Sequence, residues 1–327
     1  MENEVFLSVK NLTVDYETHD ETVYAVRDVS FELKKGATLG LVGETGAGKT
    51  SIARAILRVL PEPPAKLKSG EIYLNGQELN ALSEKEMYQI RGKKITMIFQ
   101  DPMTALNPVM RVGDQIAEVV LLHDHVSKEE ARKRAIGMLE QVGISADRYD
   151  DYPNQFSGGM KQRVVIAIAL ACSPDLLLAD EPTTALDVTI QAQVLRLIKK
   201  LVTTQHTSML LITHDLGVVA QTCDEVAIVY AGQIVEKGNK EDIFDRHAHP
   251  YTIGLLGAIP TLDSKVKRLA TIKGLPPDPT VLPKGCSFCE RCPFAEADCA
   301  SVPPALQEIA PGHLCRCHHP QKGGNGK

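Results

Sequence analysis

The sequence has no hydrophobic stretch long enough to cross a lipid bilayer. Its longest apolar run, VVIAIALAC at Val164–Cys172, is far shorter than the roughly 20 residues that a membrane-spanning helix needs. The N-terminal residues MENEVFLSVK also lack the positively charged and apolar regions of a signal peptide. We therefore expect a cytosolic protein that contacts a membrane only through partner proteins.

The chain also has no excess of basic charge. Its formal net charge is −5, which gives no support for nucleic-acid binding, and we expect no nucleic-acid partner. Hydrophobic residues make up 43% and charged residues 24% of the 327 residues, as in soluble globular proteins. This length predicts one large domain or two modest ones.

Cysteine is scarce in most of the chain. Only Cys172 and Cys223 precede residue 286, and both lie in apolar contexts that indicate inert core residues. The other six of the eight cysteines crowd into Cys286–Cys317. In a reducing cytosol such a cluster favours metal ligation over disulfides.

The pattern of the remaining residues predicts a mainly parallel α/β fold with attachments. Alternating residues near the N-terminus, and the Asn-Gly pair in GEIYLNGQEL at 70–79, predict an antiparallel β part. Residues 112–143 are helical in pattern, and Ser127 with Glu130 forms a candidate capping box. After residue 156, short apolar strands alternate with helices, which predicts a parallel sheet. A proline-rich linker at 274–285 precedes the cysteine-rich module.

GETGAGKTS, at Gly43–Ser51, fits the phosphate-binding pattern G-x-x-x-x-G-K-[ST]. Glycines let the chain curl so that successive N–H groups point at phosphate oxygens. The apolar TLGLV before it and the helical pattern over 49–60 supply the strand and helix that this loop needs. In this reading Lys49 reaches the β- and γ-phosphates and the Thr50 hydroxyl ligates Mg²⁺. The nucleotide-binding residues predicted from this loop are Gly43, Glu44, Thr45, Gly46, Ala47, Gly48, Lys49, Thr50 and Ser51.

LLLADE, at Leu176–Glu181, supplies two carboxylates at the end of a predicted buried strand. Asp180 is placed to hold Mg²⁺ beside the phosphate-binding loop. Glu181 is then the candidate general base that polarises a water for attack on the γ-phosphate. A surface Asp-Glu pair is the alternative, and the phosphate-binding loop upstream makes it the weaker one.

FSGGMKQR, at Phe156–Arg163, is a second anion-binding pattern, with a serine and two glycines before a helix. It resembles the signature motif of ATP-binding cassette (ABC) transporter ATPases, and the resemblance covers roughly Val5–Gly238. In that family two subunits stack head to tail, so that the signature motif of one covers the γ-phosphate held by the other. The residues that the resemblance assigns to this shared site are Ser157, Gly158, Gly159 and, in the D-loop-like ALD, Asp187.

Other stretches match the same family in order. Gln100 in IFQDP resembles the Q-loop glutamine, which contacts Mg²⁺ and senses the transmembrane partner. His214 in LITHD resembles the switch histidine, which contacts the γ-phosphate and supports Glu181. Tyr16 matches the aromatic residue that stacks on adenine. Tyr24 is a rival for this role because the stretch between the first two strands is long.

HPYTIGLL at His249–Leu256, with GLPP and the cysteines after it, resembles the oligopeptide/dipeptide importer branch, as does QDPMTALNP at Gln100–Pro108. This implies an ATPase at the cytoplasmic face of the membrane whose ATP-driven dimer closure energises peptide import. Its partners would be a second ATPase subunit, identical or paralogous, two transmembrane permease subunits and an extracytoplasmic binding protein. Relatives carry nickel or other small solutes. A non-transport ABC clamp would predict tandem cassettes, a coiled-coil insertion or a basic extension, and the sequence has none.

The cysteine spacing leaves the metal open. The importer pattern C-x₅-C-x₆-C-x₁₇-C maps onto Cys286, Cys292, Cys299 and Cys317, and some members of the branch hold a [4Fe–4S] cluster there. Cys289 would complete a ferredoxin-like C-x₂-C-x₂-C run, but the next cysteine follows too late for that motif. Zinc suits four thiolates but prefers C-x₂₋₄-C pairs, and a disulfide or no metal remains the third alternative. Cys289 and Cys315 are extra cysteines in the importer pattern.

ATP hydrolysis transfers no electrons, so the predicted metal is structural, a crosslink for a module with few apolar residues. Redox sensing is the alternative role. The resemblance therefore implies a P-loop NTPase cassette over 1–240, with a mainly parallel sheet, an antiparallel β subdomain and an inserted helical subdomain at about 105–165. Residues 241–327 form the importer extension, with its metal-binding cysteine module at 285–319.

Overall fold

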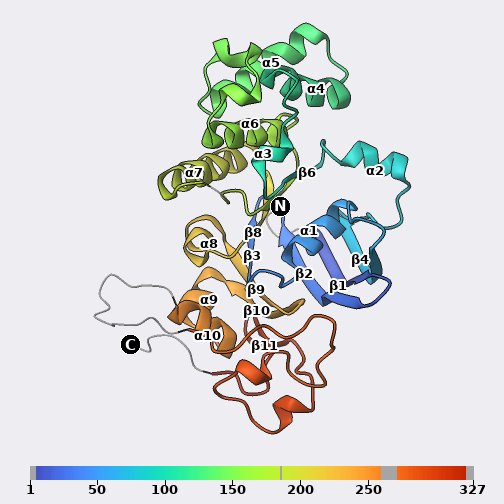
Figure 1. The fold of residues 1–327 in the computed structure, drawn as a ribbon, viewed down its shortest axis with the longest axis vertical. Coiled ribbons are helices and arrows are strands. Elements are labelled where there is room, and N and C mark those ends of the chain that lie inside the picture. The colour runs from blue at the N-terminus through green and yellow to red at the C-terminus, as the bar shows by residue number, and fades with distance from the viewer. Residues whose placement is uncertain (1–4, 185, 259–270, 322–327) are drawn as a thin grey trace. The chain divides into compact units, whose positions relative to one another are not determined.

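A computed structural model describes residues 5–184, 186–258 and 271–321 (Figure 1). They form two compact units, which we describe separately. The first takes its described residues from the ranges Met1–Phe6, Leu33–Thr38 and Gln77–Ile212, and the second takes its described residues from Leu7–Glu32, Leu39–Gly76 and Thr213–Lys327. In the described ranges, no helix combines the length and the apolarity needed to cross a membrane.

The first unit is built on three parallel strands, β6 (Ile95–Ile98), β7 (Leu176–Asp180) and β8 (Ser208–Thr213). Ile95 pairs with Leu176, and Leu176 pairs with Ser208. Every residue of these strands is buried. Burial on both faces explains why their sequences are nearly continuous apolar runs rather than alternating ones.

Helices make up the rest of the first unit, where α4 and α5 lie side by side and both contact α6 (Figure 1, green). Their bounds are α2 (Glu84–Ile90), α3 (Pro102–Ala105), α4 (Val112–Asp124), α5 (Lys128–Gln141), η1 (Ala146–Asp150), η2 (Pro153–Gln155), α6 (Gly158–Leu170) and α7 (Val188–Gln205). Gly113 lets the Tyr149 ring approach α4, because a Cβ at Gly113 would lie 2.2 Å from that ring. The Tyr149 hydroxyl donates to Asp114 at 2.9 Å and fixes this contact.

Only one of the two hydrogen bonds of the predicted capping box of α5 forms. The Ser127 hydroxyl accepts a hydrogen bond from the Glu130 N–H at 3.2 Å, as predicted. The Glu130 carboxylate, however, accepts from Arg134 Nε at 3.0 Å, one turn further along the helix. An arginine at i+4 thus competes with the Ser127 backbone for this carboxylate.

The second unit contains an antiparallel sheet in the order β2 (Thr22–Lys34), β1 (Val5–Glu17), β4 (Ala65–Leu74). After β4, Asn75 and Gly76 both have positive φ, at 48° and 75°, as a two-residue type I′ turn requires. The two-residue β5 (Gln77–Glu78) follows directly. The Asn-Gly signal in the sequence therefore marks a real turn.

A second sheet of this unit runs in the order β3 (Thr38–Val42), β9 (Glu225–Tyr230), β10 (Gln233–Asn239), β12 (His313–Cys315), β11 (Gln307–Ala310). Strands β3 and β9 are parallel, and the others are antiparallel to their neighbours. The last two strands come from the cysteine-rich module, which thereby joins the sheet through the pairing of Glu236 with Cys315. The sequence did not predict this extension.

The remaining helices of the second unit are α1 (Lys49–Leu57), α8 (Leu216–Thr222), α9 (Lys240–Asp245), α10 (Pro250–Gly257), η3 (Cys289–Arg291) and η4 (Asp298–Ala300). Helix α1 ends three residues before its predicted end, because Arg58 adopts the left-handed conformation at φ 53°. Phe288, only 2% exposed, anchors the cysteine-rich module on Tyr230 and Tyr251, with ring centroids 5.2 and 5.4 Å apart. The module thus takes its apolar core from the rest of the unit.

Candidate functional site

The phosphate-binding loop has the backbone that its glycines predict. Gly46 and Gly48 have positive φ, at 82° and 94°. A Cβ at Gly43 would lie 2.1 Å from the Val229 carbonyl oxygen, so this residue passes too close to β9 for any side chain. The buried Lys49 ammonium donates to the carbonyl oxygens of Gly43 and Glu44 at 2.8 and 2.9 Å. These bonds hold the lysine inside the curl of the loop.

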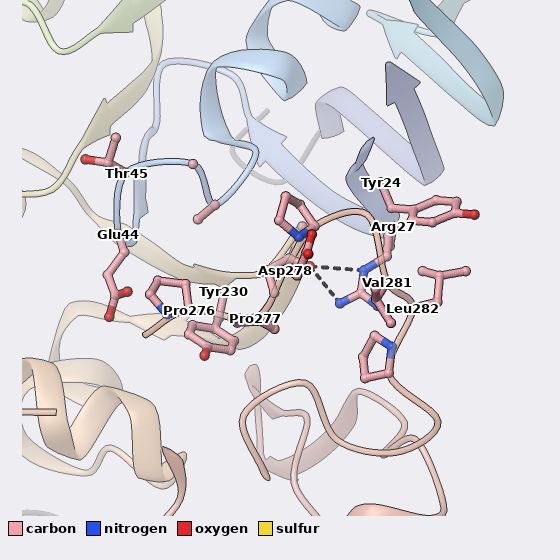
Figure 2. A pocket seen from close by; sticks show the side chains of 16 residues that line it. Tyr24, Arg27, Glu44, Thr45, Tyr230, Pro276, Pro277, Asp278, Val281 and Leu282 are labelled. Carbon is pink, nitrogen blue, oxygen red and sulfur yellow. Dashed lines mark hydrogen bonds between the residues drawn. The ribbon is translucent and has the colours of Figure 1, made fainter. Parts of the chain in front are cut away.

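The two tyrosines that the sequence offers for adenine stacking both lie near this loop. The Tyr16 hydroxyl is 3.0 Å from the Ser51 hydroxyl in the first turn of α1. Tyr24 lies elsewhere around the loop, in a cavity of about 150 Å³ that Glu44–Ala47 and the prolines of the linker also line. Figure 2 shows the linker passing between Glu44 and the strand that carries Tyr24 and Arg27. The Tyr24 N–H donates to the Pro279 carbonyl at 2.9 Å, which ties the linker to β2.

Three predicted site residues, Asp180, Glu181 and Gln100, lie together at the C-terminal end of β7 in the first unit. Asp180 is buried at the last position of the strand. Glu181 follows with a φ of 45°, a left-handed conformation that is unfavourable for glutamate, and its N–H donates to the Ile212 carbonyl at 2.8 Å. Gln100 Nε2 and the Thr184 hydroxyl both donate to Glu181 Oε2, at 3.1 and 2.9 Å. Two donors thus orient the candidate base.

The signature stretch and the D-loop-like stretch of the first unit also lie together. Ser157 caps α6, where its exposed hydroxyl accepts from the Met160 N–H at 3.4 Å. Asp187 caps α7 in the same way, accepting from the Ile190 N–H at 3.0 Å. A Cβ at Gly159 would lie 2.7 Å from Ile190, so this glycine permits the two helix starts to touch.

The predicted site residues fall into both units. Gln100, Ser157, Gly158, Gly159, Asp180, Glu181 and Asp187 belong to the first, and Tyr16, Gly43, Glu44, Thr45, Gly46, Ala47, Gly48, Lys49, Thr50, Ser51 and His214 to the second. His214 is exposed and directly follows β8. The roles that the resemblance gives these residues stay predictions.

Five of the six clustered cysteines line one small cavity. They are Cys286, Cys289, Cys292, Cys299 and Cys317, together with His318 and His319. Cys315 does not line this cavity and is fully buried in β12. The four cysteines of the importer pattern therefore share one cavity, and Cys289 faces it as well. Burial raises the pKa of Cys317 to about 11, so a metal would have to displace the thiol proton.

The sulfur spacing bears on which metal fits. Among the described residues, no three cysteine sulfurs lie within 4.8 Å of one another, and the trio of donors that does is Asp298, Cys299 and His319. Four thiolates around one zinc ion, at about 2.3 Å each, would lie about 3.8 Å apart. The donors that lie close enough together for a single ion are therefore Asp298, Cys299 and His319 rather than four thiolates.

Sequence reasoning missed the buried carboxylate of Glu236. It accepts from the N–H groups of Ala248 and His249 at 2.6 and 3.0 Å, and its other contact is His313 Nε2 at 2.8 Å. Glu236 thereby links β10, the start of α10 and β12. Burial lowers the pKa of His249 to about 4, so this histidine is neutral at pH 7. The one signal in the sequence is a glutamate that directly follows the apolar residues Ile234 and Val235 in QIVEKG.

Comparison with known families gives two matches. Residues 26–184 match the family described as ABC transporter, and residues 235–299 match the oligopeptide/dipeptide transporter C-terminal region. The dipeptide transport ATP-binding protein DppD of Bacillus subtilis is 51% identical over 316 residues, 96% of this chain and 94% of DppD. The oligopeptide transport ATP-binding protein OppD of Escherichia coli is 48% identical over 319 residues, 97% of this chain and 94% of OppD.

Solved structures give the same fold. The ATP-binding cassette MJ0796, in a dimeric post-hydrolysis state bound to ADP and Pi, superimposes with a TM-score of 0.65. The two chains are 30% identical, and the match covers 72% of this chain and 98% of the cassette. The predicted P-loop NTPase cassette is therefore confirmed as the fold.

Proposed function

This chain belongs to the ABC transporter ATP-binding proteins of the oligopeptide/dipeptide type, and on that premise we propose that it energises the import of di- or oligopeptides. It is an ATPase, for which ATP and Mg²⁺ are expected. The observation that carries the peptide assignment is the match of residues 235–299 to the C-terminal region of oligopeptide/dipeptide transporters. A cassette match alone would leave the solute open.

The proposed reaction divides the work among this chain's residues. The N–H groups of the phosphate-binding loop and the Lys49 ammonium hold the phosphates, while Thr50 and Asp180 hold Mg²⁺. Glu181, oriented by Gln100, accepts a proton from the attacking water, and His214 steadies the γ-phosphate. Tyr16 stacks on the adenine.

The second half of each site comes from a facing ATPase subunit. Its Ser157, Gly158 and Gly159 cover the γ-phosphate with the N-terminus of α6, and Asp187 contacts the opposing subunit. Support comes from the exposure of Ser157 on the first unit and from the dimeric state of the cassette MJ0796. The helical block after Gln100 would transmit the closure of the ATPase dimer to two membrane permeases at the cytoplasmic face. An extracytoplasmic binding protein would deliver the peptide to these permeases.

Peptide uptake by cells that depend on this chain tests the proposal. Lys49→Ala should abolish uptake of a labelled dipeptide, because the phosphates lose their buried cation, and it should leave the chain in the membrane fraction. Wild-type chain should copurify with two permeases from native membranes. Normal dipeptide uptake after loss of the chain, or uptake of nickel alone, would contradict the peptide assignment.

We further propose that Cys286, Cys292, Cys299 and Cys317 hold a [4Fe–4S] cluster. The cavity that these four cysteines share supports this assignment, and four thiolates are the ligand set of such a cluster. When bound, the group would crosslink the chain. The cysteines come from loops on both sides of the short segment 303–312, so ligation ties β11 and β12 to the rest of the module.

Cys292→Ser should remove the metal and destabilise the module. We expect a lower unfolding temperature and faster proteolysis after residue 285, measured by calorimetry and mass spectrometry of anaerobically purified protein. Cys172→Ser is the control, because this lone thiol lies in the first unit, where burial raises its pKa to about 11. Loss of metal without either change would refute the crosslink. A metal-containing protein without a visible absorbance band that dithionite bleaches would refute the iron–sulfur assignment, since zinc is colourless and redox-inert.

A further inference from the structure

Glu44 in the phosphate-binding loop contacts the C-terminal extension through two separate groups. Its carboxylate accepts from Arg291 Nη1 at 3.0 Å, and its N–H donates to the Tyr251 hydroxyl at 3.1 Å. Its carbonyl oxygen accepts from the Lys49 ammonium at 2.9 Å. One residue therefore links the phosphate-binding lysine to two side chains that lie more than 200 positions away in the sequence.

Arg291 is held rigidly enough to fix its partner. Its side chain is 7% exposed, while that of Glu44 is 27% exposed. Besides the contact with Glu44, Arg291 donates to the Tyr230 hydroxyl at 3.3 Å and to the Lys273 carbonyl at 3.2 Å. A guanidinium with three partners loses little further freedom when it pairs with a carboxylate, and the pair is shielded from solvent on the arginine side.

Tyr251 is a second fixed contact. Its ring is fully buried and packs on Tyr230 and Phe288, with centroids 4.6 and 5.4 Å away. Burial raises the pKa of Tyr251, so the hydroxyl stays neutral. The hydroxyl oxygen therefore accepts the Glu44 N–H from a position that the aromatic cluster determines.

We propose that Arg291 and Tyr251 are positioning residues for ATP binding, which hold Glu44 so that its carbonyl keeps Lys49 in place inside the loop. This inference rests on the proposed role of Lys49 in phosphate binding. It assigns the C-terminal extension a direct part in shaping the nucleotide site. A loop free to move at Glu44 would have to be ordered by the nucleotide itself, which weakens binding.

Affinity of the full-length chain for a fluorescent ATP analogue tests the inference. We expect Arg291→Ala to weaken binding about three- to tenfold, the size typical of coupled contacts, and Arg291→Lys to restore part of it. Tyr251→Phe should weaken binding to a smaller extent. The matched control is Arg316→Ala, since Arg316 lies in the same module but donates to the Ile234 and Pro304 carbonyls at 3.0 and 3.3 Å.

A double-mutant cycle separates positioning from simple destabilisation. If Arg291 acts through Glu44, then Glu44→Gln should weaken binding similarly, and Arg291→Ala should add little in that background. Unchanged affinity in both single variants, or an equal loss in Arg316→Ala with matching falls in unfolding temperature, would overturn the inference. Lys49→Ala tests the premise that Lys49 binds phosphate. If this variant binds ATP as well as the wild type, both the inference and the proposed function of the loop are overturned.

Discussion

Replacing Glu181 by glutamine is expected to lower ATP turnover at least about 100-fold while ATP binding persists, because general-base catalysis contributes that much or more. Glutamine keeps the shape of the side chain and can still accept the hydrogen bond from the Thr184 hydroxyl, but it has no carboxylate to take a proton from water. ATP would then stay bound between two subunits. We therefore expect the variant to accumulate as an ATP-bound dimer that wild-type protein forms only transiently.

Phosphate release and light scattering with excess Mg·ATP measure these two effects. Glu140→Gln is the matched control, since it makes the same change at an exposed position of α5. Gln100→Ala should give a smaller loss, because it removes one of the two donors to Glu181 and leaves the carboxylate. Full turnover by the Glu181 variant would remove this residue as the base and leave the geometry around it without its proposed role.

The parts of the fold that the sequence predicted are those determined locally. The conformation of the loop Gly43–Ser51 is determined by its own sequence, because its glycines allow the chain to curl and because an apolar strand and a helix flank it. The turn at Asn75 and Gly76 and the serine cap at Ser127 depend on a few neighbouring residues. Local chemistry is visible in a single sequence.

The features that the sequence did not predict depend on partners far away in the chain. Nothing near Glu44 indicates Arg291, and nothing near Glu236 indicates that His313 will pair with it. The same holds for β12, a three-residue strand whose existence depends on pairing with β10. Short strands and long-range side-chain contacts of this kind are set by tertiary packing rather than by propensity. The end of α1 at Leu57 is a smaller case, because a left-handed Arg58 is hard to foresee.

The surface of the first unit supports the proposal that a second subunit completes the site. The caps Ser157 and Asp187 are both exposed, and Val188 beside them is 81% exposed. The N-termini of α6 and α7 touch at Gly159 and Ile190. The Asp187 carboxylate offsets the positive end of α7, whereas the neutral Ser157 caps α6, so the N–H groups at the start of α6 keep the positive end of that helix dipole. An anionic phosphate presented by a facing subunit would satisfy them.

Ser157→Arg is therefore expected to reduce turnover on the order of 100-fold, as removal of a preorganised phosphate-binding group does. ATP affinity of the dilute monomer should stay the same, because Lys49 and the loop are untouched. Ser127→Arg is the matched control, since it removes an equivalent serine cap in the same unit.

The sharpest measurement mixes the Ser157→Arg and Glu181→Gln chains. In a head-to-tail homodimer each mixed pair contains one intact site, so a 1:1 mixture should regain about a quarter of the wild-type activity. Wild-type turnover that is independent of protein concentration and indifferent to Ser157→Arg would contradict the shared site.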